Sequence, residues 1–386
     1  MAIGRGGGSI KTKLAFLLYG DKGTWKSSMC LEFMKYKRDD GSPFRVLYID
    51  AEQGSVDTYL SAYQENGYDL RNIYIVYTQS LSETKEFIKK AKLNQDFYEF
   101  DEETGEETDT VYMDSEGKPF RPDAIVVDGV SLLYVAKQQS MLQFSKKRAT
   151  VRAKKNELIG LEKEVAIEGA GIEVKDYQGL KFSGQDLILD LLACGKHFAI
   201  TAREEEEKTD AKDSSNEYKR VSTGKKIPQG FKDLGYNVKT VIHLFKDDDG
   251  VIKGHIEDKD RSLVHKQGDI LEEPTLLDWA VVLEQNKNRK DFVVDNNLDK
   301  AVEIERKAIE KENDKYEQEL EPEVAAEKEY STPEEFHNAI KSAISKLDAV
   351  TKAKKQSAIV ESGLPKSYTK VQDISQLKKY LEIILK

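Results

Sequence analysis

The chain has 386 residues, of which 39% are hydrophobic and only 8 are proline, so it can form two or three folded domains and is not disordered throughout. Its 60 Lys and Arg residues against 70 Asp and Glu residues give a formal charge of -10. That balance excludes a globally basic surface for nucleic acid and leaves only local ones. Cys30 and Cys194 lie in apolar runs without C-x-x-C spacing. We therefore expect core thiols in a reducing compartment, not a disulfide framework or a zinc site.

Membrane insertion is not expected, because no run approaches eighteen consecutive apolar residues. Residues 1–12 are rich in glycine and lack the charged and then apolar pattern of a signal peptide. These features predict a cytoplasmic protein with no membrane partner.

Five apolar runs in the first two hundred residues are nearly continuous: 14–19, 45–49, 73–77, 124–127 and 197–201. Continuous runs are typical of strands that helices bury on both faces, so they predict an α/β fold with a mainly parallel sheet. A Gly- and Thr-rich turn separates the first run from a helical segment at 27–36. Two later runs, 240–245 and 251–257, are separated by Asp247-Asp-Asp-Gly250 and predict a hairpin that adds antiparallel strands at one edge.

Two polar segments interrupt this pattern. Residues 96–116 contain ten acidic residues and no basic one, and turn signals flank residues 110–113. We predict an acidic hairpin insertion at about 96–120, whose plainer interpretation is a solvated excursion. Residues 204–230 are polar until Ile227, which predicts a long mobile loop.

The C-terminal part predicts a separate module. Residues 291–330 form a charged linker or helix, in which Pro322 is a helix breaker. Ser331-Thr-Pro-Glu-Glu335 predicts the start of a new helix, and the pattern of 331–386 predicts a small helical module. This module has ten basic and six acidic residues, a net charge of +4. The charge is an indication of a nucleic-acid contact, but a solvated adaptor or an oligomerisation unit is the more common interpretation of such a module.

A phosphate-binding loop is predicted between the first run and its helix. Gly20-Asp-Lys-Gly-Thr-Trp-Lys-Ser27 matches G-x-x-x-x-G-K-[ST] except at Trp25, where glycine normally permits close approach to phosphate. Backbone N–H groups would cradle the phosphates of ATP, Lys26 would neutralise their charge, and the Ser27 hydroxyl would bind Mg²⁺. The predicted ATP-binding residues are Gly20, Asp21, Lys22, Gly23, Thr24, Trp25, Lys26, Ser27 and Ser28. An ordinary strand-turn-helix junction is the alternative.

Acidic residues follow two other predicted strands. Asp50 and Glu52 come after the second run, from which a carboxylate can reach a water beside the γ-phosphate, and Glu52 is the candidate general base. Asp128 ends the fourth run, where an acid can hold Mg²⁺ through water. Singly, each acid is more typical of a cap or a turn. Because the carboxyl ends of parallel strands meet at one edge, together they indicate a site.

Three motifs follow the phosphate loop in this order: Leu47-Tyr-Ile-Asp-Ala-Glu-Gln53, Asp123-Ala-Ile-Val-Val-Asp-Gly129 and His197-Phe-Ala-Ile-Thr-Ala-Arg203. With them, about residues 10–285 resemble the RecA-type recombinase core, and more closely the phage RecA-like ATPases of the Sak-four type. The resemblance implies that residues 1–290 are a RecA-like P-loop core with bound ATP and Mg²⁺. It also implies a host-cell cytoplasmic location if a phage encodes the chain.

The resemblance further assigns roles to single residues. Glu52 matches the catalytic glutamate, Asp128 the magnesium-site acid and Arg203 the sensor position. Lys259 and Arg261 fall where such proteins carry cations that reach the γ-phosphate of a neighbouring subunit; their alternative is a set of surface ion pairs. Residues 204–230 correspond to a DNA-binding loop, with four candidate phosphate contacts: Lys219, Arg220, Lys225 and Lys226.

A second basic stretch is an alternative DNA contact. Residues 145–155 contain six cations and no acid, which indicates either a phosphate-tracking patch or a solvated amphipathic helix.

The expected function is a Mg²⁺-dependent, DNA-stimulated ATPase that handles single-stranded DNA in phage or mobile-element recombination or replication. It would self-associate as a ring or filament, and 331–386 could contact a single-strand binding or replication protein. The alternative is a nucleotide-gated oligomeric regulatory or adaptor protein with weak or no hydrolysis. A small-molecule kinase is a third class, disfavoured because no acceptor-site motif is recognisable.

Overall fold

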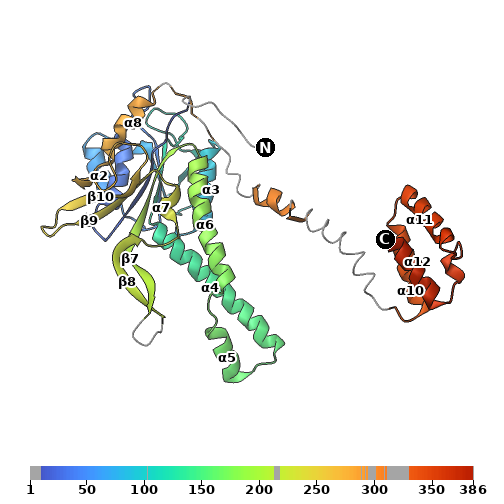
Figure 1. Ribbon diagram of the computed structural model, residues 1–386. Coiled ribbons are helices and arrows are strands. Elements are labelled where there is room, and N and C mark those ends of the chain that lie inside the picture. Colours follow the sequence, from blue (N-terminus) through green and yellow to red (C-terminus); the bar gives the residue numbers. More distant parts are fainter. Residues whose placement is uncertain are drawn as a thin grey trace. The chain divides into compact units, whose positions relative to one another are not determined.

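The computed structural model describes residues 10–101, 103–212, 218–287, 289–291, 293, 301–307, 309–310 and 330–385. The chain divides into two compact units, Met1–Asn296 and Asn297–Lys386 (Figure 1). Most of the charged linker or helix predicted at 291–330 lies outside the described residues, although 301–307 are helical. The domain boundaries expected from the sequence therefore stay predictions.

A nine-stranded sheet forms the centre of the first unit. Its strand order is β11-β10-β9-β1-β7-β6-β2-β3, with β8 paired to β7. The strands that run parallel to one another are β1 (Ala15–Gly20), β2 (Val46–Asp50), β3 (Ile73–Tyr77), β6 (Ala124–Asp128), β7 (His197–Lys212) and β9 (Thr240–Lys246). Every residue of β1, β2 and β6 is buried, which explains their continuous apolar runs. The predicted α/β class with a mainly parallel sheet is confirmed.

Antiparallel strands complete one edge of this sheet. β10 (Ile252–Asp260) pairs antiparallel with β9, and β11 (Ile270–Glu272) pairs antiparallel with β10. The predicted hairpin between β9 and β10 is therefore present. However, β9 itself runs parallel to β1, so the expectation that both strands would be antiparallel additions was wrong for β9. Its buried side chains place it inside the sheet, where it needs a strand partner on both sides.

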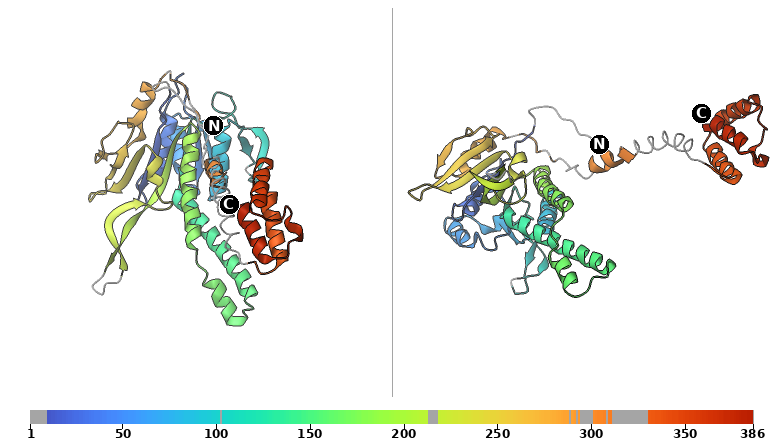
Figure 2. Two further views of the ribbon diagram at one scale, coloured as in Figure 1. Left: turned by 45° about the vertical axis from the view of Figure 1, so that its right-hand side comes forward. Right: turned by 60° about the horizontal axis from the view of Figure 1, so that its bottom comes forward.

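Helices cover both faces of the sheet, as the views in Figures 1 and 2 show. On one face, α3 (Leu81–Lys92), α4 (Val130–Lys155) and α6 (Val174–Ala193) pack in a core that includes Cys194. On the other face, α1 (Lys26–Cys30) and α8 (Ala280–Gln285) share a second core that includes Cys30. Both cysteines are free and buried, as predicted for core thiols.

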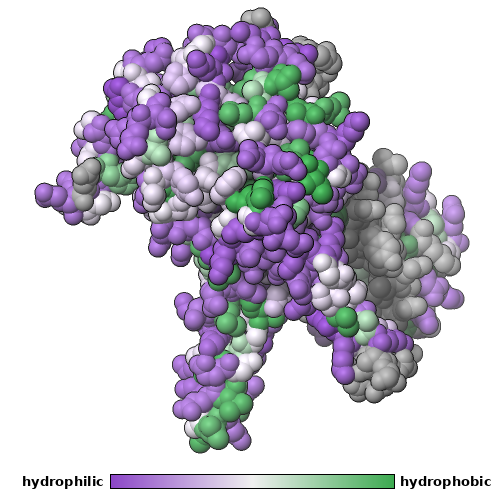
Figure 3. All heavy atoms as spheres, turned by 90° about the vertical axis from the view of Figure 1, so that its left-hand side faces the viewer, coloured by the Kyte–Doolittle hydropathy of each residue, from purple (hydrophilic) through white to green (hydrophobic). Residues whose placement is uncertain are grey.

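The first unit also contains shorter elements, namely α2 (Asp57–Glu65), α5 (Gly160–Glu168), α7 (Leu234–Asn237), and the 3₁₀ helices η1 (Leu31–Lys35), η2 (Leu70–Asn72) and η3 (Leu276–Trp279). The C-terminal part of α4 projects from the sheet together with α5 (Figure 1). Hydrophobic side chains are visible near the tip of this projection in Figure 3, where Val151, Ile159 and Leu161 are exposed. The projection therefore adds surface, not core.

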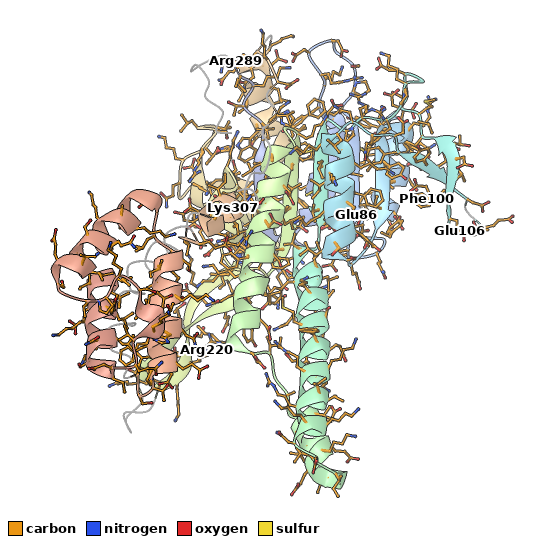
Figure 4. All side chains as sticks on the ribbon, turned by 90° about the vertical axis from the view of Figure 1, so that its right-hand side faces the viewer. Glu86, Phe100, Glu106, Arg220, Arg289 and Lys307 are labelled. Carbon is orange, nitrogen blue, oxygen red and sulfur yellow. The ribbon has the colours of Figure 1, made fainter. Side chains whose placement is uncertain are left out.

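A two-stranded antiparallel sheet occupies the acidic segment predicted as an insertion. It consists of β4 (Tyr98–Phe100) and β5 (Glu107–Val111). The Tyr74 hydroxyl donates to the Tyr98 carbonyl at 2.7 Å and ties this sheet to the core. Figure 4 labels Phe100 and Glu106 in this hairpin, and the Phe100 ring centroid lies 6.2 Å from that of Tyr74.

The second unit contains the predicted small helical module. Its helices are α10 (Pro333–Ser345), α11 (Ala349–Glu361) and α12 (Ile374–Leu385), with the 3₁₀ helix η4 (Tyr368–Lys370) between the last two. Thr332 caps α10 in a capping box with Glu335, and Pro333 is its first residue. Phe336, Ile340 and Leu377 meet in a core of its own. Among the described residues of either unit, no helix is long and apolar enough to cross a membrane.

Candidate functional site

The predicted phosphate loop, Gly20–Ser27, lies between β1 and α1 at the carboxyl end of the parallel strands. Gly20 is required there, because a Cβ on it would lie 2.0 Å from the Leu244 carbonyl oxygen of the neighbouring strand β9. Inside the loop, the buried Thr24 hydroxyl donates to the Asp21 carbonyl at 2.7 Å. The missing Cβ at Gly20 thus lets the loop lie close to β9, and the Thr24 hydroxyl braces the loop internally.

Lys26 folds its side chain back over this loop. Its ammonium donates to the carbonyls of Gly20 at 3.0 Å and Asp21 at 2.6 Å. Burial lowers the pKa of Lys26, and the charges of four nearby carboxylates oppose that effect: Asp128, Glu52, Asp21 and Glu204. Two of them, Glu52 and Asp128, are the acids that the sequence predicts at this site. The ammonium can exchange its carbonyl partners for phosphate oxygens without leaving the loop.

Trp25 occupies the glycine position without changing the backbone conformation that glycine favours. Its φ is 66° and its ψ is 14°, which lie in the left-handed region, and its side chain is 48% exposed. Holding an L-residue in that region costs about 1–2 kcal/mol. Trp25 also accepts the first α-helical hydrogen bond, from the Met29 N–H at 2.8 Å. The loop therefore keeps its conformation at the expense of backbone strain.

Asp50 organises the turn that carries Glu52. Its carboxylate accepts hydrogen bonds from four successive backbone N–H groups at 2.8–3.0 Å, those of Glu52, Gln53, Gly54 and Ser55. All its strong acceptor positions face the turn, so Asp50 acts as a structural residue, in line with the plainer sequence interpretation. It positions Glu52 but takes no direct part in the candidate site.

Asp128 is buried at the end of β6 among three hydroxyl groups. It accepts from the hydroxyls of Tyr48 and Ser55, each at 2.7 Å, and from Thr201. Two of these bonds are to Oδ2 and one is to Oδ1, so one lone pair of Oδ1 remains among the roughly four sites of a carboxylate. The sequence did not predict these hydroxyls, because Tyr48 and Thr201 are brought beside Asp128 only by the strand order.

The oxygen donors here fit Mg²⁺. This ion takes one or two carboxylates together with phosphate and water oxygens, and Ser27 and Asp128 supply one hydroxyl and one carboxylate. Among the described residues, no cluster of three or more His, Cys, Asp or Glu side chains could hold a metal by protein ligands alone. A magnesium site at this position therefore depends on the phosphates of a nucleotide.

Glu52 and Arg203 form a two-point ion pair. Arg203 donates from Nη2 to Oε2 at 2.8 Å and from Nε to Oε1 at 3.2 Å, and the guanidinium is 51% exposed. The contact raises the pKa of Arg203. On the other side of Glu52 lies Gly129, which has a φ of 92° and where a Cβ would lie 3.0 Å from Glu52 Cγ. The candidate general base is therefore held in one position.

Arg203 also lies at the root of an antiparallel ribbon. Of the segment predicted as a mobile loop, 204–230, residues 204–212 form the outer half of β7 and 218–228 form β8 (Tyr218–Pro228), so the prediction was wrong for these residues. Charged residues on both faces of the ribbon hide the two-residue period that identifies a strand. Arg203 O accepts from the Gln229 N–H at 2.7 Å, and Ser131 Oγ bridges the Arg203 N–H and the Gln229 carbonyl.

The four candidate phosphate contacts lie on this ribbon and are here called the ribbon cations: Lys219, Arg220, Lys225 and Lys226. Figure 4 labels Arg220 there. They have acidic neighbours: Lys226 lies 3.5 Å from Glu204, Lys225 lies 3.4 Å from Glu257, and Arg220 lies 3.8 Å from Asp210. Lys219 also has an interaction partner. Contact with a nucleic acid would thus require an exchange of partners.

The base of the ribbon is joined to the phosphate loop by an aromatic contact. The ring of Tyr19 stacks on His243 with centroids 4.6 Å apart, and His243 Nε2 lies 2.8 Å from Glu204. The Tyr19 hydroxyl donates to Glu257. Burial, followed by the charge of Asp258, raises the pKa of Glu257 to about 7. None of these contacts was predicted from the sequence.

Lys246 is a further cation that sequence reasoning missed. A Cβ on Gly23 would lie 3.3 Å from Lys246 Nζ, so this ammonium lies beside the phosphate loop. Its position as the last residue of β9, adjacent to β1, is the signal that could have identified it.

Lys259 and Arg261 lie at the amino ends of the parallel strands, whereas the phosphate loop lies at their carboxyl ends. β10 runs antiparallel to β9, and its last residue, Asp260, pairs with Thr240 at the start of β9. Lys259 Nζ donates to the Tyr236 carbonyl at 2.7 Å, and the Arg261 N–H donates to the Lys239 carbonyl. The structure therefore does not bring these two residues to the phosphate loop of their own chain.

The basic stretch 145–155 lies on α4. Three of its cations face acids of α5 and the start of α6: Lys146 pairs with Glu168, Arg148 with Asp176, and Arg152 with Glu173. These pairs fit the interpretation of a solvated helix better than that of a free phosphate-tracking patch.

Comparisons with known proteins give a structural neighbour but no matching family. No family model matches the chain, and no curated protein matches it. Among solved structures, the chain is similar to a KaiC-like protein from the hyperthermophilic archaeon Pyrococcus horikoshii OT3, with 13% identity and a TM-score of 0.37 over 68% of this chain and 91% of that one. At this identity and TM-score, the strand order and register described above remain the grounds for the fold.

Proposed function

We propose that the first unit is a RecA-like core that binds ATP with Mg²⁺ and hydrolyses it. The observation that carries the proposal is the position of Lys26, whose ammonium lies on the loop carbonyls within the electrostatic reach of Glu52 and Asp128. A phosphate-binding loop needs this combination of a cation, backbone N–H groups and nearby acids.

Each residue has a defined task in this proposal. Lys26 transfers from the loop carbonyls to the β- and γ-phosphate oxygens and offsets their charge. Ser27, through its hydroxyl, and Asp128, through its carboxylate, would hold Mg²⁺ beside the phosphates. Mg²⁺, when bound, neutralises charge on the phosphates. Glu52 accepts a proton from the attacking water once Arg203 releases its carboxylate.

We further propose that the ribbon contacts single-stranded DNA and that the chain works as a self-associated assembly in phage or mobile-element recombination or replication. The link between Arg203 and Gln229 at the ribbon root supports this idea, since a shift of the ribbon would move Arg203 relative to Glu52. In such an assembly Lys259 and Arg261 would act on the site of a neighbouring subunit.

A second candidate is a nucleotide-gated regulatory or adaptor protein with weak or no hydrolysis. The Arg203–Glu52 pair favours it, because the guanidinium occupies both carboxylate oxygens that would accept the proton of the attacking water. The acidic partners of the ribbon cations favour it as well, because they reduce the positive potential available to DNA.

ATP binding and steady-state phosphate release, with and without single-stranded DNA, distinguish the two candidates. Lys26→Ala should abolish ATP binding, whereas Lys22→Ala in the same loop should retain it, since Lys22 would contribute mainly its backbone N–H. Glu52→Gln should retain binding and slow hydrolysis by about a hundredfold or more. ATP affinity that is unchanged in Lys26→Ala would refute the nucleotide site. ATP binding without DNA-stimulated turnover would favour the regulatory candidate.

A further inference from the structure

A second concave site lies at the amino ends of the parallel strands. The pocket has a volume of about 430 Å³, within the range of small-molecule sites. It is formed by the residues that precede β1, those that follow η1, and the turn that leads into β7, with the end of α8 as one wall. Neither the candidate site nor the ribbon includes any of these residues.

This pocket is separate from the phosphate loop. Lys13 precedes β1, whereas Gly20 ends it, and β1 has 6 residues. At about 3.3 Å per residue, the two sites are roughly 20 Å apart across the sheet. The Lys11 N–H donates to the Lys290 carbonyl at 2.9 Å, so the segment before β1 is bonded to the residue that follows Arg289, which Figure 4 labels.

Cations dominate the lining. Six basic side chains contribute to it: Lys11, Lys13, Lys37, Arg38, Lys92 and Lys196. Four acids also line the pocket, so the lining keeps an excess of positive charge in a chain whose overall formal charge is -10. Lys11 and Lys13 are only 20% and 22% exposed, which makes them part of the wall, unlike freely solvated lysines.

The positive charge is only partly neutralised by protein groups. Lys11 pairs with Asp39 and Lys13 pairs with Asp291, both at 2.6 Å. By contrast, Lys196 donates to the neutral amide oxygen of Asn94 at 3.4 Å. Arg38 Nη2 pairs with Glu116 at 2.7 Å, but among the described residues its buried Nε has no hydrogen-bond partner, and Asp123 lies 4.0 Å from that Nε.

Burial, together with the positive charge of the pocket, lowers the pKa values of two neighbouring groups, Lys239 and His197. Burial and then the charge of Lys13 lower the pKa of Lys239 to about 8. Burial, followed by Lys13, Lys239, Lys11 and Lys196, lowers the pKa of His197. Each shift has a cation among its causes, so another positive charge is unfavourable here and a negative ligand would relieve the repulsion.

The pocket also has a neutral donor and an apolar wall. His197 Nδ1 accepts from the Leu14 N–H at 3.1 Å, so the neutral ring carries its proton on Nε2. Phe44 packs against this ring with centroids 5.4 Å apart. Leu283 and Val293 also line the pocket. Such a wall suits a ligand with an organic part better than a bare inorganic anion.

We propose that this pocket binds a nucleoside phosphate, with its phosphate against Lys37, Arg38 and Lys196 and its organic part against the apolar wall. The volume, the excess of basic over acidic side chains in the lining and the Arg38 Nε that has no hydrogen-bond partner together carry the assignment. It does not depend on the phosphate loop or on ATP hydrolysis.

Calorimetric titration of the full chain carrying Lys26→Ala tests the proposal, since that substitution removes the phosphate loop as a competing site. Adenosine 5′-monophosphate and inorganic phosphate serve as the two probes. We expect the nucleotide to bind and inorganic phosphate to bind at least about tenfold more weakly. Equal affinity for both probes, or no binding of the nucleotide, would overturn the proposal.

Two further substitutions locate the bound nucleotide. Lys196→Met keeps the length of a half-buried side chain, and Lys37→Gln changes an exposed one. Each should weaken adenosine 5′-monophosphate binding by about tenfold or more, the usual worth of a charged hydrogen bond. Lys163→Gln on α5 is the control and should bind as the parent does. Unchanged affinity in Lys37→Gln together with Lys196→Met would exclude this pocket.

Discussion

Replacing Arg203 by glutamine should increase DNA-free ATP hydrolysis, because it removes the partner that holds Glu52. The pair joins two atoms of each side chain, at 2.8 and 3.2 Å, but its guanidinium is 51% exposed. Solvent screening reduces such a contact to about 1 kcal/mol. That free energy corresponds to a factor of about five in population. The fraction of molecules with a free Glu52, and with it the turnover number, should rise by up to about fivefold.

Steady-state phosphate release with saturating ATP and Mg²⁺, without DNA, measures this effect. The Arg203→Gln/Glu52→Gln double variant should be no faster than Glu52→Gln alone, because the gain operates through Glu52. Arg71→Gln is a matched control, since Arg71 pairs with Asp69 through a similar exposed contact in η2. An unchanged rate in Arg203→Gln would show that the pair does not restrain Glu52. A lower rate would show that Arg203 itself promotes hydrolysis.

Three further predictions concern Trp25 in the phosphate loop, Glu257 beside it and the ribbon cations. Trp25→Gly should be more stable than Trp25→Ala by about 1 kcal/mol in denaturant unfolding, because glycine relieves the left-handed strain at φ 66° and loses part of that gain to chain entropy. The folded-state pKa of Glu257, about 7, is raised above its ordinary value of 4.5, so its contribution to stability is present below pH 4.5 and is lost as the pH rises through 7. The melting temperature should therefore fall from pH 5 to pH 8 more in the parent than in Glu257→Gln. Alanine at all four ribbon cations should weaken single-stranded DNA binding about equally for all sequences, and it should flatten the slope of log affinity against log salt by up to about three units.

Each of these three has an outcome that would contradict it. Equal unfolding free energies of Trp25→Gly and Trp25→Ala would mean that the loop backbone is unstrained. Parallel melting curves across pH for the parent and Glu257→Gln would mean that Glu257 titrates normally. A salt slope unchanged by loss of the ribbon cations would direct attention to 145–155 or to the second unit.

Several features of this protein were determined by its sequence. The strands β1, β2 and β6 are recognisable because burial on both faces requires continuous apolar residues, which is a local property. The start of α10 is recognisable because Thr332 and Glu335 cap it within one turn. The phosphate loop is recognisable because its residues are consecutive in the chain, so that its motif is also a local property.

The tertiary structure decided which distant groups meet. Arg203 reaches Glu52, and Tyr48, Ser55 and Thr201 surround Asp128, because β2, β6 and β7 are neighbours in the sheet. Strand order depends on long-range packing, which no local pattern encodes. The ribbon was missed because its stability depends on cross-strand pairs, not on a buried face. The cationic pocket likewise combines short polar segments before β1, after η1 and before β7, none of which indicates a site by itself. Their charges meet only because all three segments lie at the amino ends of the parallel strands.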